Sequence, residues 1–411
     1  MSPFTRVARR RAAALLGALT AAAATLTVTA PAATADDMRS REWYLDAMKA
    51  DQMWKVATGK GITVAVIDTG VDSTLPELRG KVLPGRNFDT GGAGRVDDED
   101  TDRHGTNMAL TIAGSGADGG VKGIAPDATI LPVKTGANWN FDWTATHKGI
   151  KYAVDNGARV INVSRGGPAL KEYTAEWRKT VDYALKKGAL VFAGSGNDRS
   201  GSPSYPASIP GVVAVGAVDT KGSVATFSNY GPHLALAAPG VEIPGRCTKD
   251  KTKFCAGEGT SQATAIASGS AALIWSAHPD WTANQVLRVM METAGHNGPV
   301  PSKYIGYGTV RPAQVLLEGK GDPGDPNVNP LLAAQGVGAG ATPATPKTTP
   351  KTSPSPENTG AGDEGQVADR AAAPDEGGFP LWVIVAGAVA VVAVIGFVVL
   401  AGVRRRASTD A

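Results

Sequence analysis

The chain has 411 residues, a formal net charge of +3 at pH 7 and two cysteines. Part of this small positive excess lies at the two ends of the chain, so the charge gives no case for nucleic-acid binding. Two cysteines are too few for a zinc site, and we expect neither a metal nor a cofactor.

Residues 1–35 have the pattern of a secretory signal peptide. Arginines are clustered near the start, an apolar run follows over residues 12–30, and Ala33-Thr34-Ala35 is a small-residue cleavage site. The alternative, a membrane helix that stays in place, is disfavoured because the run is rich in Ala and Thr and ends at Pro31. We expect cleavage before Asp36.

Residues 61–318 alternate short apolar runs with amphipathic stretches and are expected to form one domain. The apolar runs predict strands at residues 61–68, 128–133, 159–163, 189–193 and 212–218. The amphipathic stretches predict helices at residues 107–115, 144–156 and 173–187. Strands that are apolar on both faces and separated by helices indicate a mainly parallel sheet covered on both sides, a three-layer α/β sandwich.

Asp68 ends the first predicted strand, and sites in such sheets form at the carboxyl ends of the strands. A carboxylate just past an apolar strand is partly desolvated. This environment suits a group that orients an imidazole and stabilises its charged form. The alternative is a turn aspartate that accepts hydrogen bonds from the amides that follow it.

An acidic segment, Asp97-Asp98-Glu99-Asp100 with Asp102, precedes the next motif. Its oxygen ligands could bind calcium, although their spacing matches no specific calcium loop. A solvated acidic loop is the favoured alternative, and such a loop could also attract a basic substrate.

His104 stands at the head of a predicted helix, where Gly105 and Ala109 leave room beside the imidazole. The alternative for a single histidine is an ordinary surface or core residue. That alternative fits the other four histidines better, because none of them has comparable neighbours. His104 is therefore the candidate general base.

Ser261 lies in a turn of small residues that runs into the apolar stretch 266–277. At the N-terminal end of a buried helix a serine hydroxyl is exposed and tightly positioned, yet serine is also a preferred helix cap there. The order carboxylate, imidazole and hydroxyl along the chain favours the interpretation of Ser261 as a nucleophile.

Asn197 follows a strand and two glycines. Its side-chain amide could donate a hydrogen bond, together with the Ser261 amide, to an oxyanion. Alone, this Gly-x-Gly-Asn pattern is more often a turn.

Cys247 and Cys255 lie in a predicted loop of an exported protein. A local disulfide is favoured, and it would brace the loop that leads into Gly257. The alternative is a free reactive thiol, although no histidine adjoins either cysteine in sequence.

The C-terminal part of the chain predicts a tether and a membrane anchor. Residues 319–378 are rich in Pro, Thr, Gly and Ala and have too few large apolar residues to fold, so they are expected to be a disordered linker. Residues 379–403 are expected to form a transmembrane helix, because 381–403 carry no charge. The arginines at the start of the tail, residues 404–411, indicate its cytoplasmic side.

Five segments in order carry a resemblance to the subtilisin family of serine endopeptidases. They are Val64-Ala-Val-Ile-Asp68, His104-Gly-Thr, Asn162-Val-Ser164-Arg-Gly166-Gly167, Gly194-Ser-Gly-Asn197 and Gly259-Thr-Ser261-Gln-Ala263. Five motifs in this order are far more specific than any one of them. The resemblance covers about residues 61–317.

By this resemblance Asp68, His104 and Ser261 form a catalytic triad that hydrolyses peptide bonds through an acyl-enzyme, with Asn197 in the oxyanion hole. Ser164, Arg165 and Gly166 would then bind an extended peptide substrate through backbone hydrogen bonds. The chain departs from the common family pattern at Asn107-Met108, at Ala265 and at Arg165. A guanidinium at 165 could favour an acidic peptide, or it could fold outward into solvent, which is the favoured alternative.

The overall layout is similar to that of the mycosins, the membrane-anchored subtilisin-like proteases associated with type VII secretion. Residues 36–60 are too few for a folded inhibitory propeptide, and we expect this N-terminal extension to pack on the domain. The resemblance implies secretion-machinery partners, a single-pass location in the cell membrane and an extracellular catalytic domain. A second hypothesis is a structural subunit of the secretion complex whose active site is little used or occluded.

Overall fold

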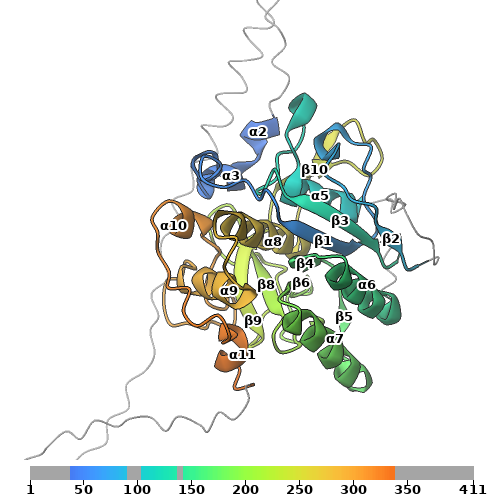
Figure 1. The fold of residues 1–411 in the computed structure, drawn as a ribbon. Coiled ribbons are helices and arrows are strands. Elements are labelled where there is room, and N and C mark those ends of the chain that lie inside the picture. The colour runs from blue at the N-terminus through green and yellow to red at the C-terminus, as the bar shows by residue number, and fades with distance from the viewer. Residues whose placement is uncertain (1–37, 90–102, 137–141, 338–411) are drawn as a thin grey trace, which may run out of the picture. The chain divides into compact units, whose positions relative to one another are not determined.

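The computed structural model describes residues 38–89, 103–136 and 142–337 (Figure 1). Its centre is a seven-stranded sheet in the order β2-β3-β1-β4-β6-β8-β9, and every neighbouring pair in it is parallel. The strands are β1 (Thr63–Asp68), β2 (Arg86–Asn87), β3 (Thr129–Lys134), β4 (Val160–Val163), β6 (Leu190–Gly194), β8 (Val213–Val218) and β9 (Leu234–Pro239). The prediction of a mainly parallel α/β sheet is confirmed. The two edge strands, β2 and β9, were not predicted: β2 has only two residues, and β9 is rich in alanine.

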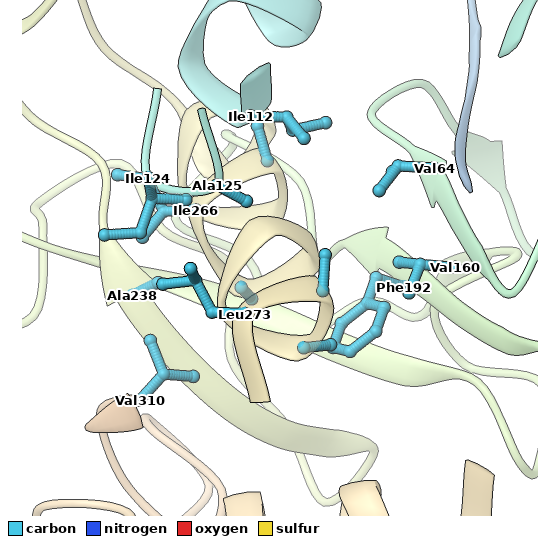
Figure 2. Packing of buried hydrophobic residues seen from close by; sticks show 14 of the residues in the cluster. Val64, Ile112, Ile124, Ala125, Val160, Phe192, Ala238, Ile266, Leu273 and Val310 are labelled. Atoms are coloured by element: carbon cyan, nitrogen blue, oxygen red, sulfur yellow. The ribbon is translucent and has the colours of Figure 1, made fainter. Parts of the chain in front are cut away.

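Helices cover both faces of this sheet. On one face lie α5 (His104–Ala113) and α8 (Thr260–Ala277), and on the other lie α6 (Trp143–Asp155) and α7 (Thr174–Lys186). In Figure 2 the side chains of Ile112 from α5 and Phe192 from β6 lie beside α8, and Leu273 extends from α8 itself. Because most of α8 is Ala, Ser, Thr and Gly, its backbone lies close to the strands and nearly the whole helix is buried.

Helix α9 (Ala283–Glu292) was not predicted, although its start signal is in the sequence. The side-chain oxygen of Thr282 accepts a hydrogen bond from the Gln285 N–H, and the Gln285 side chain accepts one from the Thr282 N–H. This capping box satisfies two amides at the helix start.

The N-terminal extension forms three short helices that lie on the domain. These are α2 (Met38–Arg41), α3 (Trp43–Ala47) and α4 (Ala50–Met53). Tyr44 and Leu45 are fully buried in the same core as α8. The Glu42 carboxylate accepts a hydrogen bond from the Lys122 N–H at 2.5 Å, and the Trp54 indole donates to the Ile124 carbonyl at 2.9 Å. Each large buried side chain here is worth about 1.5–3 kcal/mol, so the extension is part of the folded unit.

The predicted linker begins too early in the sequence. Residues 319–337 are folded, and they include α11 (Pro330–Ala334) after α10 (Pro312–Leu316). The Asn329 side chain accepts hydrogen bonds from the N–H groups at the start of α11, and Leu331 is buried in the main core. An N-cap asparagine followed by Pro330 and two leucines is a helix start, and this local signal outweighs the biased composition of the region. Residues 338–378 lie outside the described residues.

The cysteines lie in a hairpin rather than in an irregular loop. Strands β10 (Ile243–Arg246) and β11 (Phe254–Gly257) pair antiparallel, and the Sγ atoms of Cys247 and Cys255 are bonded with their Cα atoms 5.1 Å apart. A second small pairing joins β5 (Gly167–Pro168) to β7 (Ser204–Tyr205). Three short 3₁₀ helices complete the described elements: η1 (Pro76–Leu78), η2 (Ala117–Gly119) and η3 (Lys171–Tyr173).

Several expected segments lie outside the described residues: the signal peptide 1–35, the acidic loop Asp97 to Asp102, the transmembrane helix 379–403 and the tail 404–411. Among the helices of residues 38–89, 103–136 and 142–337, none combines the length and the apolar character needed to cross a bilayer.

Candidate active site

Strand β1 brings Asp68 to the carboxyl edge of the sheet. The side chain is fully buried, and its Oδ1 atom lies 2.7 Å from Nδ1 of His104. The same oxygen accepts a hydrogen bond from the Thr69 N–H at 2.8 Å. A buried carboxylate in this position fixes the imidazole tautomer that carries its proton on Nδ1 and leaves Nε2 able to accept a proton.

His104 is the first residue of α5, and the helix start is held against β1. The Gly105 N–H donates to the Thr69 hydroxyl at 2.9 Å. A Cβ at position 105 would lie 2.2 Å from the Gly70 carbonyl oxygen and 3.0 Å from the Asp68 Cβ. Only glycine therefore allows the helix to approach the strand closely enough for the Asp68–His104 contact.

An ion pair holds the residue that precedes the helix. Arg103 has left-handed backbone dihedrals (φ 51°, ψ 36°), and its guanidinium lies 3.2 Å from the Asp72 carboxylate. Burial favours the neutral acid, but hydrogen bonds from Thr74 and Arg103 outweigh it and lower the pKa of Asp72. Asp72 is thus charged at neutral pH and helps to keep Arg103 in a strained conformation at the start of α5.

Ser261 is the second residue of α8 and lies at its N-terminal end. Its hydroxyl donates to the Ser164 carbonyl at 2.9 Å, and the Ser164 hydroxyl donates to the Ser261 carbonyl at 3.1 Å. This reciprocal pair fixes the backbone around Ser261. For catalysis this hydroxyl must donate to His104 in place of Ser164, and catalytic hydrogen bonds often form only when substrate is bound.

Asn197 is clamped to the start of α8. Its Oδ1 atom accepts hydrogen bonds from the Thr260 N–H at 2.9 Å and from the Thr260 hydroxyl at 3.0 Å. In the part of the chain that the structure describes, the Nδ2 group of Asn197 and the N–H of Ser261 make no hydrogen bond. Two oriented donors at a helix N-terminus form a site for a developing negative charge.

One cavity of about 550 Å³ joins these groups. His104, Ser261 and Asn197 all line it, and so do the predicted substrate-binding residues Ser164, Arg165 and Gly166. The structure therefore brings every predicted catalytic side chain to one place: Asp68 lies behind His104, and the other three face the cavity. The described residues contain no cluster of three or more His, Cys, Asp or Glu side chains that could hold a metal ion.

The profile of the Subtilase family (Peptidase_S8) matches residues 59–308. The chain belongs to the subtilase family. It is a subtilisin-like serine protease, and the matched region contains Asp68, His104, Asn197 and Ser261.

One sequence relative and two solved structures illustrate this likeness. Subtilisin NAT from Bacillus subtilis subsp. natto is 39% identical over 266 residues, which cover 62% of this chain and 65% of that protein. The crystal structure of MycP1 from Mycobacterium smegmatis has a TM-score of 0.59 and 28% identity, covering 70% of this chain and 86% of that one. A structure described as MycP1 from the ESX-1 type VII secretion system has a TM-score of 0.58 and 29% identity, covering 70% and 88%.

Arg165 of this subtilase lies partly buried at the wall of the cavity. Its guanidinium donates to the Gly136 carbonyl at 2.9 Å. The side chain is therefore bound to the protein backbone and is not extended into solvent, which was the favoured alternative. Ser164 is 8% exposed, and its hydroxyl is bound to the Ser261 carbonyl.

Two further residues support the site, Asn162 and Ser268, and no role was predicted for either. The Asn162 amide donates to the Ser164 hydroxyl at 2.9 Å, and Ser268 of α8 donates to the Asn162 side-chain oxygen at 3.1 Å. All three side chains are buried, and they form a hydrogen-bonded chain that ends at Ser261. The sequence signal for this support was Asn162, a polar residue between the apolar residues of β4. A buried polar side chain needs hydrogen-bond partners.

A second cavity of about 440 Å³ adjoins the first on the other side of His104. It lies between α5 and the β10–β11 hairpin, and both cavities share His104, Glu258 and Gln262. His104 therefore lies where the two cavities meet, whereas Asn197 and Ser261 line the first cavity.

Proposed function

We propose that this subtilase is a serine endopeptidase whose triad is Asp68, His104 and Ser261. The observation that supports it best is the 2.7 Å contact between the buried Asp68 carboxylate and His104, beside a cavity that Ser261 also lines. In the proposed reaction His104 Nε2 takes the proton of the Ser261 hydroxyl as its oxygen bonds to the peptide carbonyl carbon. The developing oxyanion is stabilised by Asn197 Nδ2 and the Ser261 N–H.

The same imidazolium then gives its proton to the leaving nitrogen, and the C–N bond breaks to leave an acyl-enzyme. Water attacks the ester with His104 as base, which releases the acid and restores the hydroxyl. The helix dipole of α8 and the buried charge of Asp68 lower the energy of the ion pair formed in both steps. Ser164, Arg165 and Gly166 are proposed to bind the substrate backbone along one wall of the cavity.

We further propose that the protease acts outside the cell membrane, in association with a type VII secretion system. Support comes from the likeness to MycP1, which is described as part of such a system, together with the expected signal peptide and the predicted helix 379–403. In this proposal the signal is removed, residues 379–403 span the membrane, and residues 404–411 face the cytoplasm. The substrate would be an exported protein, and the partners would be subunits of the secretion machinery.

The experiment that tests the chemistry is covalent labelling of the full chain by a fluorophosphonate, which reacts with an activated serine without knowledge of the substrate. We expect labelling of the wild type and none of Ser261→Ala or His104→Ala. A folded wild-type chain that is not labelled would contradict the proposal and favour the structural-subunit hypothesis.

For the secretion role, the Ser261→Ala chain is expressed in place of the wild type. We expect loss of substrate processing, whereas unchanged processing and secretion would show that catalysis is not its role.

A further inference from the structure

We propose that Asn107 is a positioning residue that fastens the helix of His104 to the disulfide hairpin β10–β11. The inference rests on the proposed function, because it concerns how the candidate general base is held. Asn107, three residues after His104, is one of the positions at which the chain departs from the common family pattern.

The Asn107 side chain binds the hairpin as a strand partner would. Its Oδ1 atom accepts a hydrogen bond from the Arg246 N–H at 2.8 Å, and its Nδ2 group donates to the Arg246 carbonyl at 3.1 Å. A Cβ at position 245 would lie 2.7 Å from Asn107 Oδ1, so Gly245 permits this close approach. One amide side chain thus satisfies both backbone polar groups of a single hairpin residue.

Arg246 is a rigid anchor because its own side chain is fixed at several points. The guanidinium contacts the fully buried Glu77 carboxylate at 2.7 Å and 3.0 Å. It also donates to the Lys251 carbonyl at 3.1 Å, and its Cζ lies 4.1 Å from the centre of the Phe254 ring. The hairpin, closed by its disulfide, is therefore tied to η1 through a buried ion pair.

The start of α5 is held from two sides. Toward β1, the Gly105 N–H donates to the Thr69 hydroxyl and Arg103 pairs with Asp72. Toward the hairpin, the contact is the two hydrogen bonds of Asn107, which lies almost one turn after His104 on the same side of the helix. Without Asn107 the first turn can tilt about the β1 contacts. His104 is the first residue of that turn, so a small tilt of the turn moves the imidazole Nε2 relative to Ser261.

Asn107 also lines the second cavity, and a direct contact with substrate would be a different role. A fluorophosphonate separates the two roles, because it places its phosphorus on the serine and has no peptide to occupy the second cavity. If Asn107 positions His104, its removal slows labelling. If Asn107 only contacts the peptide, labelling is unchanged and only peptide hydrolysis is affected.

The test measures the second-order rate constant of labelling by fluorophosphonate-rhodamine on the full chain in detergent. We expect Asn107→Ala to be labelled on the order of 10- to 100-fold more slowly than the wild type, since small misplacements of reacting groups have effects of this size. Asn107→Asp keeps the acceptor for the Arg246 N–H but sets a carboxylate oxygen against the Arg246 carbonyl, so it should also be labelled more slowly than the wild type. In peptide hydrolysis, kcat should fall while KM changes little.

The matched control is Asn284→Ala, which removes another asparagine amide that donates from the first turn of a helix to a backbone carbonyl, that of Pro326, at 2.9 Å. It should leave the labelling rate unchanged. The Tm of each variant is measured in parallel, so that slow labelling of a chain that stays folded supports the inference. Labelling of Asn107→Ala at the wild-type rate would overturn the inference alone, whereas an unlabelled wild type would overturn the proposed function and the inference with it.

Discussion

Replacing Gly105 with alanine sets two effects of opposite sign against each other. Alanine in place of a helical glycine ordinarily stabilises a helix, by roughly 0.5–1 kcal/mol. Here, however, the new Cβ would lie 2.2 Å from the Gly70 carbonyl oxygen, and backbone atoms cannot move aside as a flexible side chain can. To restore an ordinary contact, the start of α5 must move away from β1 by about 1 Å.

The steric contact destabilises the protein by more than the gain in helix propensity stabilises it. Overpacking of this kind typically costs about 1–3 kcal/mol, which exceeds the gain in helix propensity. The effect on chemistry is larger, because the displacement separates His104 from Asp68, and a misplacement of about 1 Å can cost around 10²-fold in rate. We therefore expect Gly105→Ala to unfold at a somewhat lower temperature and to be labelled by a fluorophosphonate about 10²-fold more slowly.

The control for this prediction is Gly149→Ala in α6. A Cβ there would meet side-chain methyl groups of Thr135 and Val133 at 2.9 Å, on the sheet face opposite α5. We expect lower stability with a labelling rate close to that of the wild type. If Gly105→Ala were labelled as fast as the wild type, or were more stable, close approach of α5 to β1 would not be what holds the Asp68–His104 pair.

Three further outcomes are expected. Asn197→Ala should lower the kcat of peptide hydrolysis by about 10²–10³-fold with little change in KM, and an unchanged kcat would remove Asn197 from the oxyanion hole. Burial lowers the pKa of His147, and Glu176 opposes this effect. The contribution of His147 to stability is therefore present above the unfolded pKa of 6.5 and is lost as pH falls through the lower folded pKa. Urea unfolding at several pH values should show an unfolding free energy that decreases with falling pH, and this decrease should be weaker in His147→Gln. The double variant Cys247→Ser/Cys255→Ser should lose at most about 2.5 kcal/mol of unfolding free energy, because the loop that the disulfide closes is short. A larger loss in the same urea titration would mean that the disulfide also holds native contacts.

The sequence predicts the sheet well because its central strands are apolar on both faces. Residues 61–68 and 212–218 correspond to β1 and β8 with shifts of one or two residues at their starts. Edge strands are less distinct, since β9 has the small residues that a buried helix also uses. The start of the linker was misplaced for a similar reason: composition over sixty residues hides the local cap at Asn329.

The candidate catalytic residues could be proposed from local patterns and their order. Asp68 is the last residue of β1, His104 is the first residue of α5 and Ser261 is the second residue of α8. The ends of regular elements are where such residues are held in place. The supporting contacts could not be proposed in this way, because they join segments far apart in the chain. Asn107 and Arg246 are separated by 139 positions, and no local pattern pairs them.

The sequence by itself determined the central strands, the main helices and the nature of the candidate catalytic groups, because these depend on residue type and on near neighbours. Tertiary structure alone decided that the Ser261 hydroxyl is bonded to Ser164, that Arg165 is tied to Gly136, and that a hairpin supports α5. These contacts depend on how the strands are ordered and how closely the helices approach them. The strand order and the helix positions are set when the apolar surface of the whole domain is buried together, so they cannot be inferred from any single segment.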